Sequence, residues 1–194
     1  MTALQDISSG WDAVAQDFMK YRSDSGSTVV KEWCSRLAEN PSILDIGCGH
    51  GLPLTPILLG ANASIFAIDS SQNMVSAYRE NFPEHPIAYE AAEGSRFFDR
   101  KFVGIIAIGL IFLLPEDRQK QLLEKMSQHL KPYGHILFSA PHQICEWKDI
   151  QTGRRSVSLG SEAYRDYLER LGLRIIGDGI DKGESYYLMA QKSR

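Results

Sequence analysis

The chain has 194 residues and a formal net charge of −3, which fits one domain with a substantial core and offers no broad positive surface for nucleic acid. No apolar run approaches the roughly 20 residues that span a bilayer, and the N-terminus lacks the pattern of a secretion signal. The three cysteines are an odd number without close spacing, which fits a reducing cytoplasm better than a disulfide framework. We therefore expect one cytoplasmic domain over residues 1–194.

Strands and helices alternate along the chain. The first helix is expected over 27–39, with Ser25 or Ser27 as its N-cap. Strands are then expected over 43–46, 63–69, 87–90, 102–108 and 135–140, with helices over 72–81, 115–130 and 161–171. Two last strands, 173–177 and 185–191, are joined by a turn at 181–184. The pattern predicts an α/β fold with a doubly wound, seven-stranded, mostly parallel sheet and an antiparallel last strand.

The most informative feature is a buried strand that runs into a loop with three glycines. Gly47, Gly49 and Gly51 let the backbone turn sharply and approach a ligand with no Cβ in the way. Amides at the start of the next helix, near 52–53, favour a negatively charged ligand group. The following strand ends in Asp69, and a carboxylate there can accept hydrogen bonds from both hydroxyls of a ribose. Together these features predict a site for a nucleoside-containing cofactor.

The spacing of the loop distinguishes between such cofactors. A dinucleotide loop has the pattern Gly-x-Gly-x-x-Gly, but here the third glycine comes one residue early and Leu52 stands in its place. Asp45 lies two residues before the first glycine, inside an apolar strand, where a buried carboxylate is costly without partners. Its partner could be the amides of the loop or the ammonium group of an amino-acid-like ligand. The pattern therefore disfavours a nicotinamide dinucleotide.

With this loop the chain resembles, over nearly its whole length, the class I S-adenosylmethionine-dependent methyltransferases. The resemblance implies the Rossmann-like methyltransferase fold and S-adenosyl-L-methionine as the cofactor. In that family the Asp-x-Gly-x-Gly-x-Gly loop, here Asp45 to Gly51 with Cys48 inside it, surrounds the methionine part of the cofactor. The family's acid at the end of the second strand, here Asp69, takes the ribose. Ser70 then belongs to the start of the next helix, and Met74 lies against the adenine.

The resemblance implies two further cofactor-binding segments. After the third strand the family usually offers an acidic residue and a backbone amide to the adenine edge, and here Glu93 or only the backbone of Ala92 fills that role. Residues 1–40 resemble the family's N-terminal lid, where an aromatic residue and an arginine commonly approach the cofactor carboxylate. That arginine is Arg22, and the aromatic side chains able to cover the sulfonium are Trp11, Phe18 or Tyr21.

The acceptor pocket is expected at the exits of the fourth and fifth strands, because ligands of open sheets bind beyond the carboxyl ends of the strands. The fourth exit lacks the Asn/Asp-Pro-Pro-Tyr/Phe sequence that methylates amide or nucleobase nitrogens in related enzymes. Its apolar Ile111, Phe112 and Leu114 either wall the pocket or belong to the core. The fifth exit carries His142, which is either a catalytic general base or a surface loop histidine.

Further along, an irregular segment is expected between 147 and 160. In it Arg154 and Arg155 could pair with an acidic acceptor or form a solvated charge pair. Tyr186 and Tyr187 alternate on the last strand, so at most one is expected to face a pocket. The cysteines show no metal-ligand spacing, so no metal site is predicted.

The features together predict an enzyme that transfers a methyl group to a small-molecule acceptor, because the chain shows no added recognition domain and no basic face. A methyltransferase that acts on protein or RNA is one alternative. A non-catalytic relative that binds the cofactor or a partner is another. No nucleic-acid or membrane partner is expected.

Overall fold

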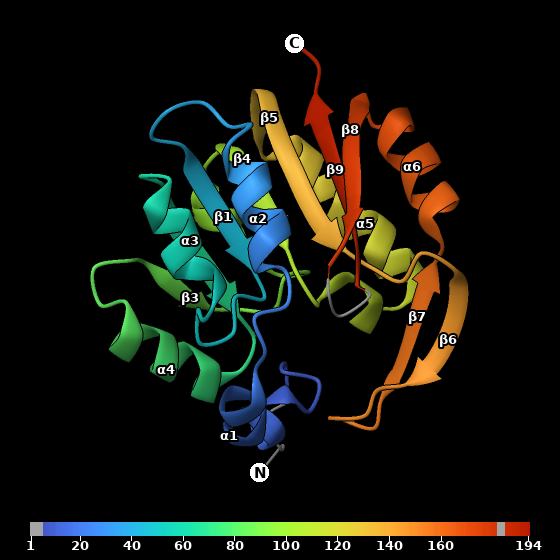
Figure 1. Cartoon of the computed structure of the whole chain (residues 1–194). Coiled ribbons are helices and arrows are strands. Elements are labelled where there is room, and N and C mark those ends of the chain that lie inside the picture. Colours follow the sequence, from blue (N-terminus) through green and yellow to red (C-terminus); the bar gives the residue numbers. More distant parts are fainter. Residues whose placement is uncertain (1–5, 182–184) are drawn as a thin grey trace.

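The computed structural model describes residues 6–181 and 185–194, with a seven-stranded sheet at the centre (Figure 1). The strand order is β3-β2-β1-β4-β5-β9-β8. Its strands are β1 Ser42–Ile46, β2 Ser64–Asp69, β3 Ile87–Tyr89, β4 Phe102–Ala107, β5 Leu130–Ser139, β8 Leu173–Ile180 and β9 Tyr186–Lys192. All pairs are parallel except those of β9, which runs antiparallel to both β5 and β8. The predicted fold class is therefore confirmed.

Six helices and two short 3₁₀ turns surround this sheet in the described part of the chain. They are α1 Trp11–Tyr21, α2 Ser27–Cys34, α3 Leu54–Gly60, α4 Gln72–Asn81, α5 Glu116–Gln128 and α6 Ser161–Arg170, with η1 Phe97–Asp99 and η2 Ile111–Leu113. None of the helices formed by residues 6–181 and 185–194 has both the length and the apolar character of a membrane span.

Two predicted details of α2 are wrong. Neither Ser25 nor Ser27 caps α2, because its N-cap is Gly26 in a left-handed conformation with φ of 87°. The Gly26 amide donates to Asp181 at 2.9 Å, and a Cβ at this position would lie 3.2 Å from the hydroxyl of Tyr187. The helix also ends at Cys34, five residues early. Residues 182–184 of the predicted last turn lie outside the described residues.

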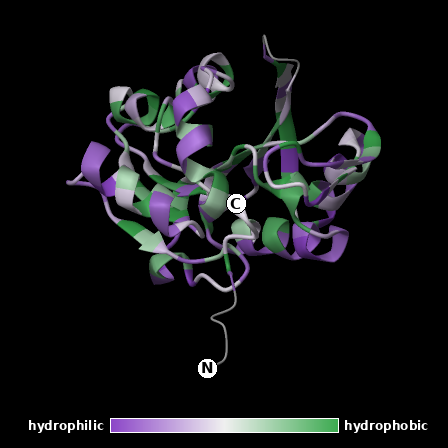
Figure 2. Ribbon diagram, turned by 90° about the horizontal axis from the view of Figure 1, so that it is seen from below, coloured by the Kyte–Doolittle hydropathy of each residue, from purple (hydrophilic) through white to green (hydrophobic). Residues whose placement is uncertain are grey.

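Alternate residues of the central strands pack on opposite faces of the sheet. On β1, Ile43 packs with α2 and α3, whereas Leu44 packs with the cluster that includes α5 and α6. Both side chains are fully buried. Hydrophobic residues accordingly colour much of the sheet, while hydrophilic residues lie along the outer helices (Figure 2). By the same alternation Asp45 shares the face of Ile43, one residue before the strand ends.

The segment predicted as irregular is instead a β-hairpin. Strand β6 (Ile144–Lys148) pairs antiparallel with β7 (Arg155–Leu159), beside the carboxyl ends of the main sheet (Figure 1). The turn between them is held by Asp149, whose Oδ1 accepts hydrogen bonds from the amides of Gln151 and Thr152 at 3.1 and 2.7 Å and from the Thr152 hydroxyl at 2.8 Å. A short polar stretch that satisfies its own backbone groups explains why hydrophobic periodicity missed the hairpin.

Candidate functional site

A cavity of about 950 Å³ lies where the parallel strands end. It is walled by the loop after β1, the end of β2, the exits of β4 and β5, the start of β9, helix α1 and the tip of the β6–β7 hairpin. Figure 1 shows α1 beyond these strand ends and the hairpin to one side of them. Ligand pockets commonly measure about 300–1,000 Å³, so this cavity has room for a nucleoside and a second small molecule.

The glycine loop is fastened to the end of β2. The amides of Gly47 and Cys48 both donate to the carbonyl of Ile68, at 2.8 and 3.2 Å. The Gly49 amide donates to Asp69 Oδ2 at 2.8 Å. Gly51 has φ of 88°, and a Cβ there would lie 2.5 Å from the ring of Phe82. The first two glycines therefore shape the cavity wall, whereas packing against Phe82 requires the third.

Asp69, Ser70 and Met74 form one wall of the cavity beside Gly49. Asp69 accepts from the amide of Ser71 through Oδ1 at 2.8 Å, in addition to the Gly49 bond. Burial raises the pKa of Asp69, and the hydrogen bonds from the Ser71 and Gly49 amides oppose that rise. Met74 is buried, and its sulfur lies 3.9 Å from the point that a Cβ at Gly49 would occupy. The sequence prediction that these residues come together is confirmed, while their role toward a cofactor stays a prediction.

Asp45 lines the same cavity at the end of β1 and is only 2% exposed. The loop amides are not its partners, which corrects one of the two sequence expectations, because they donate to Ile68 and Asp69 instead. No hydrogen bond to its carboxylate is seen among the described residues. Burial, reinforced by the charge of Asp69, raises its pKa to about 7, and Arg22 opposes this rise. A buried carboxylate of this kind fits a cationic ligand group.

Arg22 lies just after α1 and reaches into the cavity. Its guanidinium donates to the carbonyls of Ser23 and Ser25 at 3.1 and 3.3 Å, and burial lowers its pKa. Trp11 and Phe18 of α1 also line the cavity, with their rings in an edge-to-face contact at 5.3 Å. Tyr21 does not line it, and this side chain is 72% exposed.

One residue of α1 that the sequence did not single out ties the helix to the wall of the cavity that contains Asp69. Asp12 Oδ1 accepts from the Ser71 hydroxyl at 2.7 Å and from the Asn73 amide at 2.8 Å. The Ser71 hydroxyl in turn accepts from the amide of Met74 and caps α4. A carboxylate is favoured at a helix N-terminus. The sequence signal was weak, because the two partners are separated by 59 residues.

The segment predicted to reach the adenine does not line the cavity. Ala92 is buried, and the carbonyls of Ala92 and Glu93 accept from the Lys125 ammonium group at 3.0 and 3.2 Å. Cys48 does line the cavity. Burial raises the pKa of its thiol, which keeps the group protonated.

Of the apolar residues at the exit of β4, one lines the cavity and two belong to the core or pack against it. Phe112 lines the cavity, whereas Ile111 is fully buried in the core and Leu114 packs against that core. The ring of Phe112 contacts the ring of Trp147 from the hairpin, with centroids 5.4 Å apart. The hairpin therefore supports this wall of the cavity from outside.

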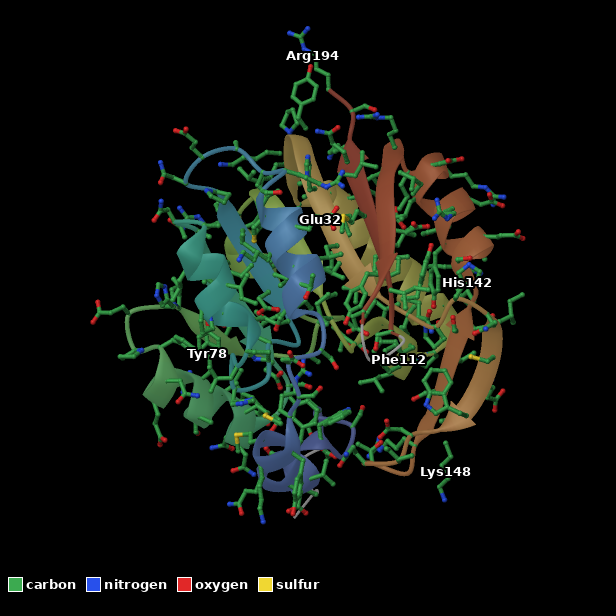
Figure 3. The ribbon with its side chains drawn as sticks, viewed as in Figure 1. Glu32, Tyr78, Phe112, His142, Lys148 and Arg194 are labelled. Carbon is green, nitrogen blue, oxygen red and sulfur yellow. The ribbon has the colours of Figure 1, made fainter. Side chains whose placement is uncertain are left out.

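At the exit of β5, His142 lines the cavity close to the start of β9 (Figure 3). Its ring meets that of Tyr186 edge-on, at 4.9 Å and 89°. Tyr186 is fixed in place because its hydroxyl bonds Asp178 at 3.0 Å and Arg165 at 2.9 Å. Tyr187 also lines the cavity, so the expectation of a single tyrosine was wrong. The reason is geometric: the cavity lies beyond the strand ends, where residues from both faces of the sheet can reach it.

The two arginines of the hairpin do not face the cavity. Arg154 pairs with Asp6 at 3.5 Å and Arg155 pairs with Glu146 at 2.7 Å, and all four side chains are largely exposed. The expectation that they meet an acidic acceptor is therefore replaced by the solvated charge pairs. The Arg154 pair also links the hairpin tip to the segment that precedes α1.

A family model described as "Methyltransferase domain" matches residues 43–134. The chain is 31% identical over 161 residues to a carboxy-S-adenosyl-L-methionine synthase from Shewanella amazonensis. The aligned segment covers 76% of this chain and 65% of that protein. It is 35% identical over 113 residues to a tRNA N(3)-methylcytidine methyltransferase from Schizosaccharomyces pombe. The aligned segment covers 52% of this chain and 36% of that protein. The chain thus spans just under two thirds of one of these relatives and about a third of the other.

A solved structure with a similar fold is the 1,6-didemethyltoxoflavin-N1-methyltransferase from Burkholderia thailandensis, with its acceptor and S-adenosylhomocysteine bound. The TM-score is 0.74 at 14% identity, and the match covers 100% of this chain and 94% of that one. At this identity the comparison concerns the fold alone.

Proposed function

We propose that the chain is a class I S-adenosylmethionine-dependent methyltransferase, as the family model over residues 43–134 and the relatives support, and that it transfers a methyl group from S-adenosylmethionine to a nucleophilic atom of a small-molecule acceptor. The observation that carries the proposal is the pair of carboxylates, Asp45 and Asp69, at the tips of adjacent strands in one cavity. Asp45 is nearly inaccessible to water, and no hydrogen-bond donor reaches its carboxylate from the described residues. An ammonium group supplied by a ligand would satisfy it.

The residues around the cavity suggest a division of the ligand into parts. Asp45, with the loop of Gly47, Cys48 and Gly49, would hold the amino-acid end, and Arg22 would meet its carboxylate. At the other end of this half of the cavity, Asp69 would accept hydrogen bonds from the ribose. Ser70 and Met74 would lie against the base. Gly51 would support the loop through its packing, and Ala92 or Glu93 would take part only at the outer edge of the adenine.

Within the segment 1–40 that resembles a lid, helix α1 would cover this ligand, whereas α2 packs against the sheet. Helix α1 places Trp11 and Phe18 against the cavity, and Asp12 fastens the helix to α4. Aromatic faces can stabilise a sulfonium charge and exclude water from it. The lid would therefore both retain the donor and keep the reacting atoms dry.

When bound, the donor supplies a methyl group activated by its sulfonium, and loss of that methyl leaves S-adenosylhomocysteine. His142 would take the proton from an O–H, N–H or S–H group of the acceptor as that atom forms its new bond to the methyl carbon. The electron pair of the broken carbon–sulfur bond stays on sulfur, and His142 later releases the proton to water. The protein otherwise contributes alignment, worth about 7–11 kcal/mol in favourable cases.

Calorimetry tests the cofactor half of the proposal. We expect S-adenosylmethionine and S-adenosylhomocysteine to bind and NAD not to bind. Asp69→Ala should weaken the binding of the first two ligands by at least about tenfold, or 1.4 kcal/mol. Asp166→Ala is the matched control, because Asp166 is exposed on α6 away from the cavity. Tight NAD binding, or unchanged affinity in Asp69→Ala, would overturn the assignment.

The relative that synthesises carboxy-S-adenosyl-L-methionine raises a second candidate, in which the chain modifies the donor itself. Mass spectrometry separates the two. After incubation with S-adenosylmethionine and pooled metabolites, methyl transfer leaves S-adenosylhomocysteine, whereas modification leaves a heavier nucleoside with its sulfonium intact.

A further inference from the structure

We propose that the methyl acceptor is an uncharged aromatic molecule, and not a phosphorylated or carboxylated one. This inference rests on the proposed function and concerns the half of the cavity farthest from the glycine loop. That half is built by the exits of β4 and β5, the start of β9 and the tip of the β6–β7 hairpin. We call it the acceptor half.

The charges around the cavity oppose an anionic acceptor. Among the described residues the charged side chains that line it are Arg22, Asp45, Asp69 and Asp149, three carboxylates against one guanidinium. The single guanidinium is the one that would meet the carboxylate of the donor, so it would not be available to the acceptor. Recognition of phosphate or carboxylate normally uses free Arg or Lys side chains or helix N-termini. The nearby arginines that could have served, Arg154 and Arg155, are paired on the surface.

A cationic acceptor is disfavoured because the polar groups of the acceptor half already form hydrogen bonds within the protein. Asp149 is the one carboxylate among the described residues that line the acceptor half, and it already holds the hairpin turn through three hydrogen bonds to its Oδ1. The Ser139 hydroxyl accepts from the amide of Gly109 at 2.8 Å. The hydroxyls of Tyr186 and Tyr187 are bonded to Asp178 and Asp181. A positive charge on the acceptor would therefore have to share the Asp149 carboxylate with the amides of the hairpin turn.

Apolar and aromatic side chains make the rest of this half. Phe112 cannot move away from the cavity easily, because Trp147 packs behind it. Pro141, Leu110, Ile150 and the ring of Tyr186 complete the surface. Ile150 and Ile180 line the cavity although they are 92% and 65% exposed, which leaves apolar area for a ligand to cover. Rings stacked or edge-on against such walls gain about 0.5–1.5 kcal/mol beyond their burial.

The polar side chains that remain available to the acceptor include those of His142, Gln143 and Gln151. All three line the cavity, and none has a side-chain hydrogen bond among the described residues. One imidazole and two amides suit a molecule with a flat apolar body and a single O–H, N–H or S–H group. Figure 3 shows Phe112 and His142 near the hairpin, on the side of the molecule opposite Tyr78.

A matched pair of probes tests this inference by calorimetry on the S-adenosylhomocysteine complex. The probes are 2-naphthol and 2-naphthoate, which share one ring system and differ in charge. We expect 2-naphthol to bind at least about tenfold more tightly than 2-naphthoate. Tighter or equal binding of the carboxylate would overturn the inference, and so would failure of both probes to bind. Incorporation of labelled methyl into bulk tRNA would overturn it as well.

A positive charge introduced into the acceptor half should reduce or remove the preference for 2-naphthol. Gln143→Arg places a guanidinium at the cavity, and we expect it to strengthen 2-naphthoate binding at least about tenfold without changing S-adenosylhomocysteine affinity. Ile144→Arg is the matched control, because Ile144 is the next residue, is 82% exposed and does not line the cavity. Equal responses of the two variants would contradict the placement of the acceptor. Loss of S-adenosylhomocysteine binding by the wild type would instead contradict the proposed function.

Discussion

Replacing Asp45 with Asn should stabilise the protein without ligand while it removes ligand binding. The carboxylate is 2% exposed, and burial together with the charge of Asp69 raises its pKa from 3.8 to about 7. A rise of this size corresponds to about 4 kcal/mol against the ionised form in the folded state. Asn keeps nearly the same shape and carries no charge at any pH, so the cost disappears.

The sign of the pH dependence follows from linkage. A carboxyl group whose folded pKa is raised stabilises the fold fully below its unfolded pKa, and that contribution is lost as pH rises through about 7. Between about pH 5 and about pH 8 the wild type should therefore lose roughly 2–3 kcal/mol relative to Asp45→Asn. For a chain of this length that difference moves Tm by roughly 5–10 °C.

The assay is thermal and urea unfolding of both proteins at several pH values, without ligand. Titrations shared by the two proteins cancel in the difference, and Asp166→Asn on the surface of α6 gives the baseline for an Asp-to-Asn change. Addition of S-adenosylhomocysteine should raise the Tm of the wild type and leave Asp45→Asn almost unchanged. A stability difference that stays flat from about pH 5 to about pH 8, or grows toward acid, would refute the reasoning about this carboxylate.

Three further predictions concern the lid and the loop. Asp12→Ala should weaken S-adenosylhomocysteine binding in calorimetry and lower the free energy of unfolding in urea by about 1 kcal/mol, because it removes the bonds to α4. The control Asp17→Ala, on the exposed side of α1, should change neither quantity. Gly51→Ala should destabilise the fold by about 1–3 kcal/mol, because φ is 88° and the new Cβ would meet Phe82; a Tm equal to that of the wild type would contradict this. At about pH 7.5 Cys48 should react with iodoacetamide far more slowly than the same thiol in the unfolded protein, since burial raises its pKa. Mass spectrometry of the labelled peptide measures this rate, and rapid modification in the folded protein would contradict the prediction.

Local patterns were sufficient for the sheet and for the residues that meet at the tips of β1 and β2. The loop glycines, Asp45 and Asp69 are each marked by where they stand relative to a buried strand, and the strand order then brings β1 and β2 together. Strand ends and residue spacing are properties of one short segment. They can therefore be recovered from a single sequence.

The acceptor half depended on contacts between distant segments and was predicted less well. The hairpin was missed because its stability comes from the hydrogen bonds of Asp149 and the contact of Trp147 with Phe112, neither of which gives a periodic signal. The bond from Ser71 to Asp12 joins residues far apart in sequence. The cap of α2 was missed because Gly26 is required there by Tyr187, more than 150 residues away. Tertiary contacts decided the last two cases, whereas the hairpin depends both on a tertiary contact and on local polar bonds in its turn.

A crystal structure with S-adenosylhomocysteine tests the central claim most directly. The account predicts its ammonium group within about 3 Å of the Asp45 carboxylate and its ribose hydroxyls at the same distance from Asp69, with the thioether facing His142. A nucleoside bound outside this cavity, or bound within it with water alone against Asp45, would contradict the account.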